Sequence, residues 1–377
     1  MNRFFRTSIL AIVRRALKGP GRFALVAAVA AALLRPAAAL ADGYLRPGTP
    51  AVGGVHHLAL IYAGNKSHVA WDAEKLLPYV AYVDRHGKPQ DWLFDSFLWL
   101  EQNAASGVSL FYQEDASHPA VKADWDWLLD AFFDPAHGVG QLEASVRLAE
   151  KDLPDKNHRV NLVIAIPMPQ QMSTKFGAVE RNGPSLNFAR DDDRMAAVQW
   201  YVRSALERWK KIDAPHVRLA GFYFLRESIE SNNRELVKRT AALLHSLNLK
   251  FYWIPFFNAE GHDRWRELGI DAMMYQPNYA FDLSVPSSRL SDAAQAAKRV
   301  GAGLEIEMDT RAVDHREFRA RYLDYLNAGV RDGFMKDALL GYYQGDGLLG
   351  VCAASPDPEL RSLYDKTYRF LKGTYRP

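Results

Sequence analysis

The chain has 377 residues, of which 48% are hydrophobic and 24% charged, and its formal net charge is +3. This composition is typical of a globular protein and excludes a disordered or fibrous chain. The basic residues form no Lys/Arg-rich run, so the charge pattern argues against a nucleic-acid partner. The only cysteine is Cys352, which excludes an intrachain disulfide and leaves the hydrophobic core to stabilise the fold.

The first 41 residues have the three-part layout of a secretory signal peptide. Residues 3–18 carry five basic side chains, residues 23–34 form an uncharged apolar run, and residues 39–41 offer a small-x-small cleavage site. The apolar run is short for a transmembrane helix, and an uncleaved membrane anchor is the alternative. We therefore expect an exported protein, periplasmic or secreted, with no stable membrane span after cleavage.

Residues 42–56 are rich in Gly and Pro and predict a short linker. Residues 57–377 then form one domain in which apolar, strand-like runs alternate with amphipathic helical patterns. The eight runs cover residues 57–62, 94–100, 159–166, 217–225, 250–257, 271–275, 303–308 and 339–343.

At least one helical pattern follows each run, and strands that alternate with helices predict a parallel sheet. Eight such units predict an α/β fold that closes into a (β/α)8 (TIM) barrel. An open doubly wound sheet is the alternative, but no G-x-G-x-x-G follows any run, which argues against its dinucleotide-binding form.

Two parts of the chain need separate predictions. Strand-like material over residues 80–83, closed by the turn signal His86-Gly87-Lys88-Pro89, predicts an insertion with a hairpin after the first strand. Residues 262–268, which end at Gly269, predict a short helix between the fifth and sixth strands.

Acidic side chains gather where two of the strands end, and a TIM barrel has its active site at that end. The fourth run closes on Arg226 and Glu227. The seventh run alternates, with Glu305, Glu307 and Asp309 on one face and apolar residues on the other. Because the apolar face must meet the dry helix layer, we expect the three acids to point into the barrel, where they need partners or a function.

Paired carboxyl groups across a barrel are what glycoside hydrolysis requires. One stays protonated and delivers a proton to the leaving oxygen, while the other stays ionised as nucleophile or base. The structural alternative is ion pairing, as a rim salt bridge at Glu227 or as a buried network of the seventh-strand acids with an arginine such as Arg226, Arg289 or Arg311. We expect no cofactor and no metal, since His56 and His57 are adjacent and cannot share one strand face.

The positions of these acids resemble a large clan of retaining glycosidases built as (β/α)8 barrels. In that clan one acid follows strand four and another ends strand seven; an Asn usually precedes the first, where this chain has Arg226. The segments 221–227, 251–257, 275–279 and 303–309 also resemble an uncharacterised bacterial family, a domain of unknown function with a glycosidase-like barrel. The resemblance implies that Glu227 is the acid/base and Glu307 the nucleophile, with Glu305 as the rival for the second role.

Polar and aromatic side chains at the strand ends are expected to contact a carbohydrate substrate, because sugar-binding pockets combine aromatic walls with a few placed polar groups. The predicted substrate-binding residues are Glu305, Asp309, Asn258, Tyr275, Gln276, Asn278, Tyr279, Arg226 and Tyr62. The alternatives to a glycoside hydrolase are an inactive barrel that binds glycan through the same residues, and another carbohydrate-active enzyme such as a lyase or a deacetylase.

Overall fold

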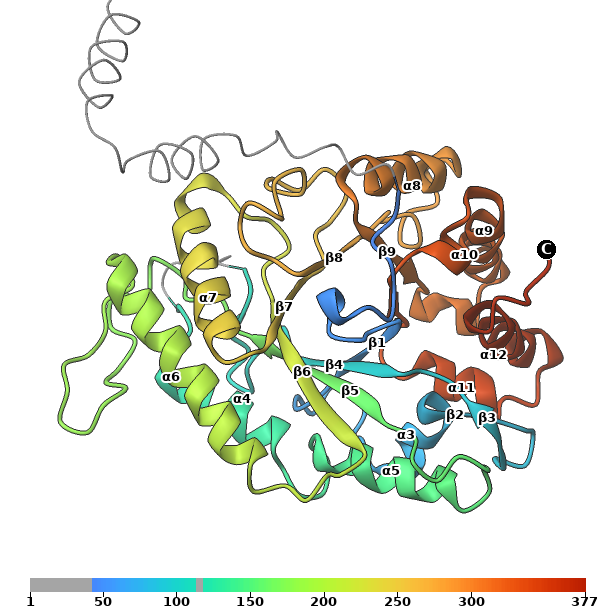
Figure 1. The fold of residues 1–377 in the computed structure, drawn as a ribbon, viewed down its shortest axis with the longest axis horizontal. Helices are drawn as coiled ribbons and strands as arrows, with labels where there is room; N and C mark the ends of the chain where they lie inside the picture. The colour runs from blue at the N-terminus through green and yellow to red at the C-terminus, as the bar shows by residue number, and fades with distance from the viewer. Residues whose placement is uncertain (1–42, 113–117) are drawn as a thin grey trace, which may run out of the picture. The chain divides into compact units, whose positions relative to one another are not determined.

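A computed structural model describes residues 43–112 and 118–377, so the predicted signal peptide lies outside the described residues. Eight parallel strands close into a barrel, which confirms the predicted (β/α)8 fold (Figure 1). The order around the barrel is β1-β10-β9-β8-β7-β6-β5-β4. The strands are β1 (His57–Tyr62), β4 (Ser96–Leu100), β5 (Val160–Ile166), β6 (Val217–Phe224), β7 (Lys250–Trp253), β8 (Ala272–Tyr275), β9 (Gly303–Glu307) and β10 (Leu340–Tyr343).

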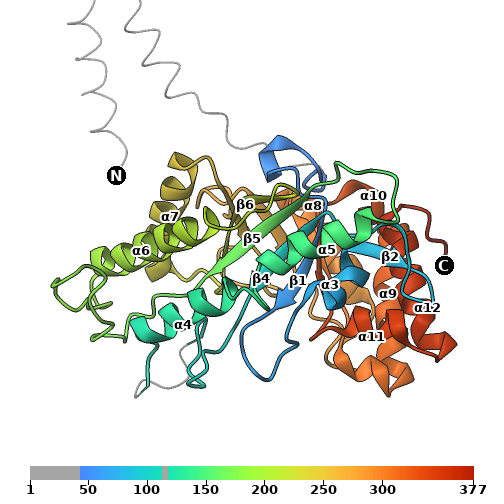
Figure 2. The ribbon, with the colours of Figure 1, turned by 90° about the horizontal axis from the view of Figure 1, so that it is seen from below.

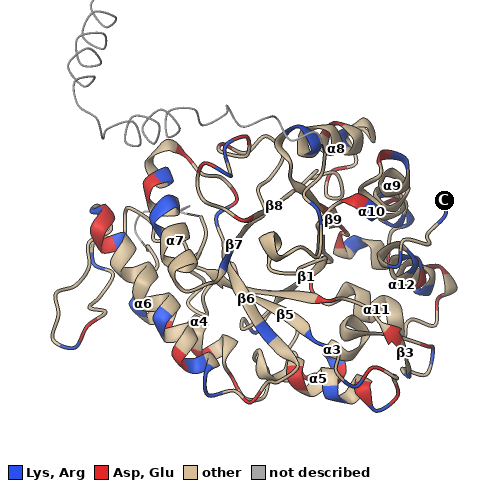
Figure 3. Cartoon of the chain, in the orientation of Figure 1, with Lys and Arg blue, Asp and Glu red and all other residues tan. Residues whose placement is uncertain are grey.

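Helices surround the strands, as two perpendicular views show (Figures 1 and 2). They are α3 (Ala73–Val80), α4 (Lys122–Phe132), α5 (Gly140–Glu150), α6 (Asp191–Trp209), α7 (Arg234–Ser246), α8 (Ser288–Val300), α9 (Arg316–Asp332), α10 (Phe334–Asp337), α11 (Leu348–Ala354) and α12 (Pro358–Leu371). Charged residues concentrate on these helices and on the loops (Figure 3). Among the described residues, no helix is long and apolar enough to cross a membrane.

The predicted hairpin is confirmed between the first two barrel strands. β2 (Ala81–Val83) pairs antiparallel with β3 (Pro89–Trp92). The hairpin lies against α12, where the ring of Tyr82 stacks on Tyr368 with centroids 4.0 Å apart. The Tyr82 hydroxyl also donates a hydrogen bond of 2.9 Å to Asp365. The hairpin therefore packs on the outside of the barrel, against α12.

The helix predicted over residues 262–268 is wrong. This segment forms successive turns between Gly261 and Gly269, both of which have positive φ, and no helix joins β7 to β8. So short a segment gains too few hydrogen bonds to offset the cost of starting a helix. Tertiary contacts fix it instead, since Trp265 is buried and its indole N–H donates to the Val300 carbonyl at 3.0 Å.

Residues 43–56, predicted as a linker, are part of the barrel body. Val52 and Val55 are fully buried, and the Tyr252 hydroxyl donates to the Val52 carbonyl at 3.0 Å. Leu45 donates its N–H to Ala302 and accepts one from Leu339, both directly before barrel strands. The Gly and Pro content of this segment therefore marks a tightly folded plug at the N-terminal ends of the strands.

Candidate active site

A cavity of about 360 Å³ opens at the C-terminal ends of the barrel strands. Glu227, Glu305 and Glu307 all line it, so the structure brings the two predicted catalytic acids and their rival into one space. Aromatic rings form much of the remaining wall; they belong to Tyr62, Tyr223, Phe281 and Tyr343.

β9 carries two of these acids because of the period-2 alternation of a strand. Glu305 and Glu307 line the cavity and are 3% and 0% exposed to solvent. β10 provides the room for the deeper acid, because Gly341 lies opposite Glu305 in the register. A Cβ at position 341 would lie 3.8 Å from Glu305 Oε1 and 3.3 Å from the Met274 sulfur. The absence of a side chain at Gly341 thus leaves space for the Glu305 carboxyl group on the floor of the cavity.

Glu307 is held by three hydrogen-bond donors. The Tyr325 hydroxyl donates to Oε2, the Tyr279 N–H donates to the same oxygen at 3.3 Å, and the Asn278 amide donates to Oε1 at 3.4 Å. Burial raises the pKa of Glu307, and these hydrogen bonds oppose the rise because they stabilise the ionised form. The group is therefore fixed in orientation and has donors ready for its negative charge.

Glu305 has a different environment. Its Oε1 is buried and has no hydrogen-bond partner among the described residues. Burial first, and then the charges of Glu307 and Glu227, raise the pKa of Glu305 well above its usual range. The environment therefore favours the protonated form of this carboxyl group in the free protein.

Glu227 follows β6 and is partly exposed toward the cavity. Burial raises its pKa to about 7, and a hydrogen bond from Gln276 opposes the rise. The alternative of a rim salt bridge finds no partner in the adjacent Arg226, since that guanidinium binds Glu230 at 2.6 Å and covers the Tyr112 ring at 4.9 Å. Glu227 is consequently poised to hold or release a proton near neutral pH.

The predicted substrate-binding residues divide into two groups. Tyr62, Gln276, Asn278 and Glu305 line the cavity, as expected for residues at the ends of β1, β8 and β9. The structure places the others outside its lining; these are Arg226, Asn258, Tyr275, Tyr279 and Asp309.

Three of these outer residues have structural partners. Asp309 pairs with Arg311 at 2.6 Å, because β9 ends at Glu307 and the alternation no longer sets the direction of the side chain. Asn258 has a left-handed φ of 62°, and its N–H donates to the Tyr275 hydroxyl at 2.6 Å.

Tyr279 also turns away from the cavity. Its hydroxyl donates to Asp324 on α9 at 2.8 Å, and only its backbone N–H serves the site, through the bond to Glu307. The sequence placed this ring correctly near a strand end but could not indicate its partner on a helix 45 positions away.

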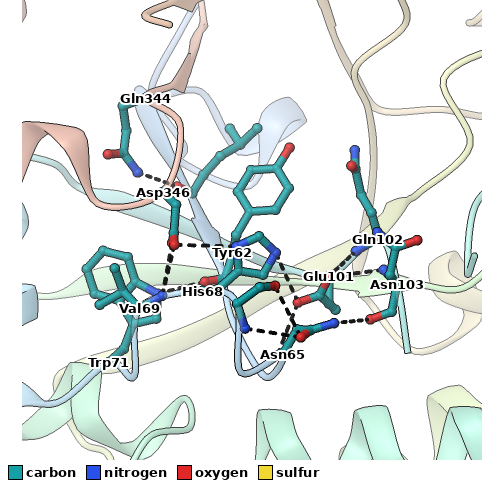
Figure 4. Close-up of polar contacts among 12 residues, drawn as sticks. Tyr62, Asn65, His68, Val69, Trp71, Glu101, Gln102, Asn103, Gln344 and Asp346 are labelled. Atoms are coloured by element: carbon teal, nitrogen blue, oxygen red, sulfur yellow. Dashed lines mark hydrogen bonds and ion pairs between the residues drawn. The ribbon is translucent and has the colours of Figure 1, made fainter. Parts of the chain in front are cut away.

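A second charged cluster at the mouth was missed by the sequence analysis (Figure 4). His68 lies between two carboxylates, with Nε2 3.4 Å from Glu101 and Nδ1 3.5 Å from Asp346. Hydrogen bonds to Asp346 and Glu101 raise the pKa of His68 to about 10, so the imidazole is charged at neutral pH. His68 and Asp346 line the cavity.

This cluster ties three loops together. Glu101 accepts backbone N–H bonds from Asn65, Gln102 and Asn103 at 2.8–3.2 Å, and Asp346 accepts one from Val69 at 3.0 Å. The available signal was barrel order, because Glu101 directly follows β4, Asp346 lies three residues after β10, and β10, β1 and β4 are neighbours once the sheet closes. The described residues contain no group of His, Cys, Asp and Glu arranged to hold a metal ion.

A family model matches residues 57–369 of the chain. The chain belongs to the family described as Domain of unknown function (DUF4855). The match covers the whole DUF4855 barrel from β1 into α12, which confirms the resemblance to an uncharacterised barrel family. No curated protein matches the sequence.

Solved structures resemble the DUF4855 barrel in fold. The catalytic domain of a family GH18 chitinase from the fern Peteris ryukyuensis has 13% identity and a TM-score of 0.42, over 84% of this chain and 99% of that one. The PgaB glycoside hydrolase domain from Bordetella bronchiseptica has 8% identity and a TM-score of 0.43, over 83% and 98%. The carboxyl transferase domain of Rhizobium etli pyruvate carboxylase has 10% identity and a TM-score of 0.40, over 88% and 51%.

Proposed function

We propose that this protein is a glycoside hydrolase that acts through Glu227 and Glu307. One observation carries the proposal: two carboxyl groups line the same aromatic-walled cavity, and they differ in their hydrogen-bond partners. Glu227 has a pKa of about 7 and no charged partner among the described residues, while Glu307 has a pKa of about 8 and three donors arranged for a carboxylate. Such a pair supplies the acid and the nucleophile or base of glycoside cleavage.

The roles follow from these environments. Glu227 delivers its proton to the glycosidic oxygen as the bond to the leaving group breaks. Glu307 faces the sugar with its charge held by Tyr325, Tyr279 and Asn278, and it attacks the anomeric carbon or activates a water molecule. The rings of Tyr62, Phe281 and Tyr343 provide apolar walls for the sugar.

The test compares two isosteric variants on two kinds of substrate, after a polysaccharide panel has identified a glycan that the protein cleaves. Glu227→Gln should lower turnover of the natural glycan by about 10²–10⁴-fold. Its effect should be much smaller on an aryl glycoside whose leaving group needs no proton. Glu307→Gln should abolish cleavage of both substrates, because its role does not depend on the leaving group.

The exposed Glu207→Gln serves as the control and should match wild type. Wild-type turnover in the Glu227 and Glu307 variants would contradict the proposal. A protein that binds glycan but cleaves none of the panel would be the inactive glycan-binding barrel, and an unsaturated product end would reveal a lyase. Proton NMR of the first product anomer then distinguishes retention from inversion.

We also propose that the chain is exported and cleaved after Ala41, on the strength of the three-part pattern of its first 41 residues. Mass spectrometry of the protein from the periplasm or medium should give a mature chain that begins at Asp42. Full-length protein retained in the cytoplasm would contradict export.

A further inference from the structure

The residues that line the cavity have an unbalanced set of charges. Glu227, Glu305, Glu307 and Asp346 contribute carboxyl groups, and no Lys or Arg of the described residues belongs to the lining. Its one basic side chain among the described residues, His68, already contacts a carboxylate through each ring nitrogen. The lining therefore offers carboxyl groups and no unmatched positive charge to whatever enters.

The arginines that follow the same strands do not correct this imbalance. Arg226, after β6, binds Glu230, and Arg311, after β9, binds Asp309. An anionic sugar would thus enter a site of low dielectric without a cation to pair with, which is costly. Uronic acids and sulfated sugars fit this cavity poorly.

Glu305 points to a more specific ligand. It is 97% buried and lines the floor of the cavity, and its Oε1 has no partner among the described residues. Two side-chain amides of the same lining donate elsewhere: the Gln276 amide donates to Ile254 at 3.0 Å, and the Asn278 amide donates to Gln276 at 2.8 Å. A buried carboxyl oxygen without a partner is unfavourable, and a ligand can satisfy it by donating an N–H or O–H group.

We infer that the substrate carries a protonated amino group, as in a glycan with free amino sugars, and that Glu305 recognises this group on the cavity floor. The inference rests on the proposed function and names its substrate class. An ammonium group supplies three donors and one positive charge, which together satisfy the unpaired carboxyl and offset the surrounding acids. A neutral hydroxyl supplies one donor and no charge.

Recognition of an ammonium group has a signature that a neutral sugar lacks. Glu305 holds a proton in the free protein, because burial and the neighbouring acids raise its pKa. The ammonium binds the ionised carboxylate, so this proton must leave as the amino sugar binds. Affinity for the amino sugar therefore increases with pH until the amine itself loses its charge.

The experiment measures binding of matched monosaccharides by ligand-observed NMR, because this readout requires neither turnover nor knowledge of the linkage. The ligands are glucosamine and galactosamine, each with its neutral parent sugar and its N-acetyl derivative. Wild type and the surface control Glu207→Gln should bind at least one amino sugar about tenfold more tightly than its parent sugar. Glu305→Gln should abolish this preference.

Equal or weaker binding of both amino sugars by wild type, or no binding of either, would overturn the inference. A second measurement covers the case in which Glu305→Gln does not fold. Calorimetry of wild type in two buffers of different ionisation enthalpy should show proton release on amino-sugar binding, and a heat independent of the buffer would also overturn it.

The outcome is separable from that of the proposed function. If cleavage depends on Glu227 and Glu307 while neutral and amino sugars bind equally, only the substrate class is wrong. If the amino-sugar preference depends on Glu305 while no glycan is cleaved, the hydrolase proposal fails and the recognition site remains.

Discussion

The two sides of the cavity use acidic residues in opposite ways. On the β9 side, Glu305 and Glu307 are buried near one another, and the pKa of each is raised. On the side of β1, β4 and β10, Glu101 and Asp346 hold His68 between them, and the pKa of that imidazole is raised to about 10. The first side raises the pKa of its buried acids, whereas the second holds fixed, matched charges.

This difference shows that a carboxylate in a pocket is informative only together with its partners. Glu101 is fully buried, as Glu307 is, yet it receives three backbone N–H bonds and contacts a charged imidazole. It fastens the loops of the mouth together. Glu305 and Glu307 lack a cation and can exchange protons with a substrate. The following predictions test that contrast, beginning with the largest effect.

The stability of the protein should depend on pH through Glu305. The pKa of this group is raised in the folded state, so it contributes stability below the unfolded value of 4.5, and that stability is lost as pH rises toward the folded-state pKa. Each pH unit in this window costs up to about 1.4 kcal/mol. Urea unfolding at about pH 5 and 7 should show Glu305→Gln gaining stability relative to wild type as pH rises.

The surface variant Glu207→Gln is the control here and should follow the wild-type pH dependence. If Glu305→Gln shows the same slope as wild type, the β9 side does not store a proton on this residue, and the contrast between the two sides is wrong.

Removal of the Tyr325 hydroxyl tests whether Glu307 acts as an ionised group. Tyr325→Phe deletes a donor that lowers the pKa of this carboxyl, so the pKa should rise further. Activity should fall about 10–100-fold at neutral pH, the effect expected for a hydrogen bond to a charged group. The acidic limb of the rate profile against pH should move to higher pH.

Tyr322→Phe is a matched control on the same helix. Tyr322 is also buried, but its hydroxyl contacts Thr367 at 2.6 Å, away from the cavity. A loss of activity shared by both variants, with no change in the pH profile, would indicate damage to α9 instead of a role at Glu307.

His68→Ala should remove the charge contacts on the opposite side of the cavity. It leaves Glu101 and Asp346 without their shared cation and should cost about 1–3 kcal/mol of unfolding free energy at neutral pH. Because the pKa of His68 is raised from 6.5 to about 10, the loss is full below about pH 6.5 and shrinks as pH rises through about 10.

His245→Ala, which removes an exposed imidazole that contacts Asp271 at 2.8 Å, should cost much less. Equal losses in the two histidine variants would mean that the mouth cluster is an ordinary surface pair.

Asp309→Asn should have the smallest effect on activity. This acid pairs with Arg311 outside the cavity lining, so turnover should stay within about threefold of wild type, while the unfolding free energy falls by about 1 kcal/mol. A loss of turnover comparable to that of the Glu307 variant would place Asp309 in the site.

The sequence predicts the barrel well because each strand has a local signal. Its eight apolar runs match the eight barrel strands, and the alternation over residues 303–307 places Glu305 and Glu307 inside. The same rule fails at Asp309, since alternation holds only while the strand continues. The helical pattern over residues 262–268 also gives a wrong prediction, because two glycines and one buried Trp determine the conformation of that segment.

The His68 cluster could not be predicted from local sequence patterns, for a different physical reason. Its acids are 245 positions apart in the chain and meet only because the barrel closes between β10 and β1. Residues that meet only because the barrel closes have no periodicity or spacing in the sequence that would reveal their contact. The direction of Asn258 and Tyr275 likewise depends on a left-handed backbone position that the sequence does not mark.

Gly341 gives the protein a simple way to change its chemistry. A methyl group there would need the Met274 side chain to yield by a few tenths of an ångström, and a larger side chain would compete with Glu305 for space. One position on a neighbouring strand therefore controls how deep a ligand can reach and how strongly the floor holds its proton. Selection or design could retune both properties by altering this single residue, without rebuilding the strand that carries the acids.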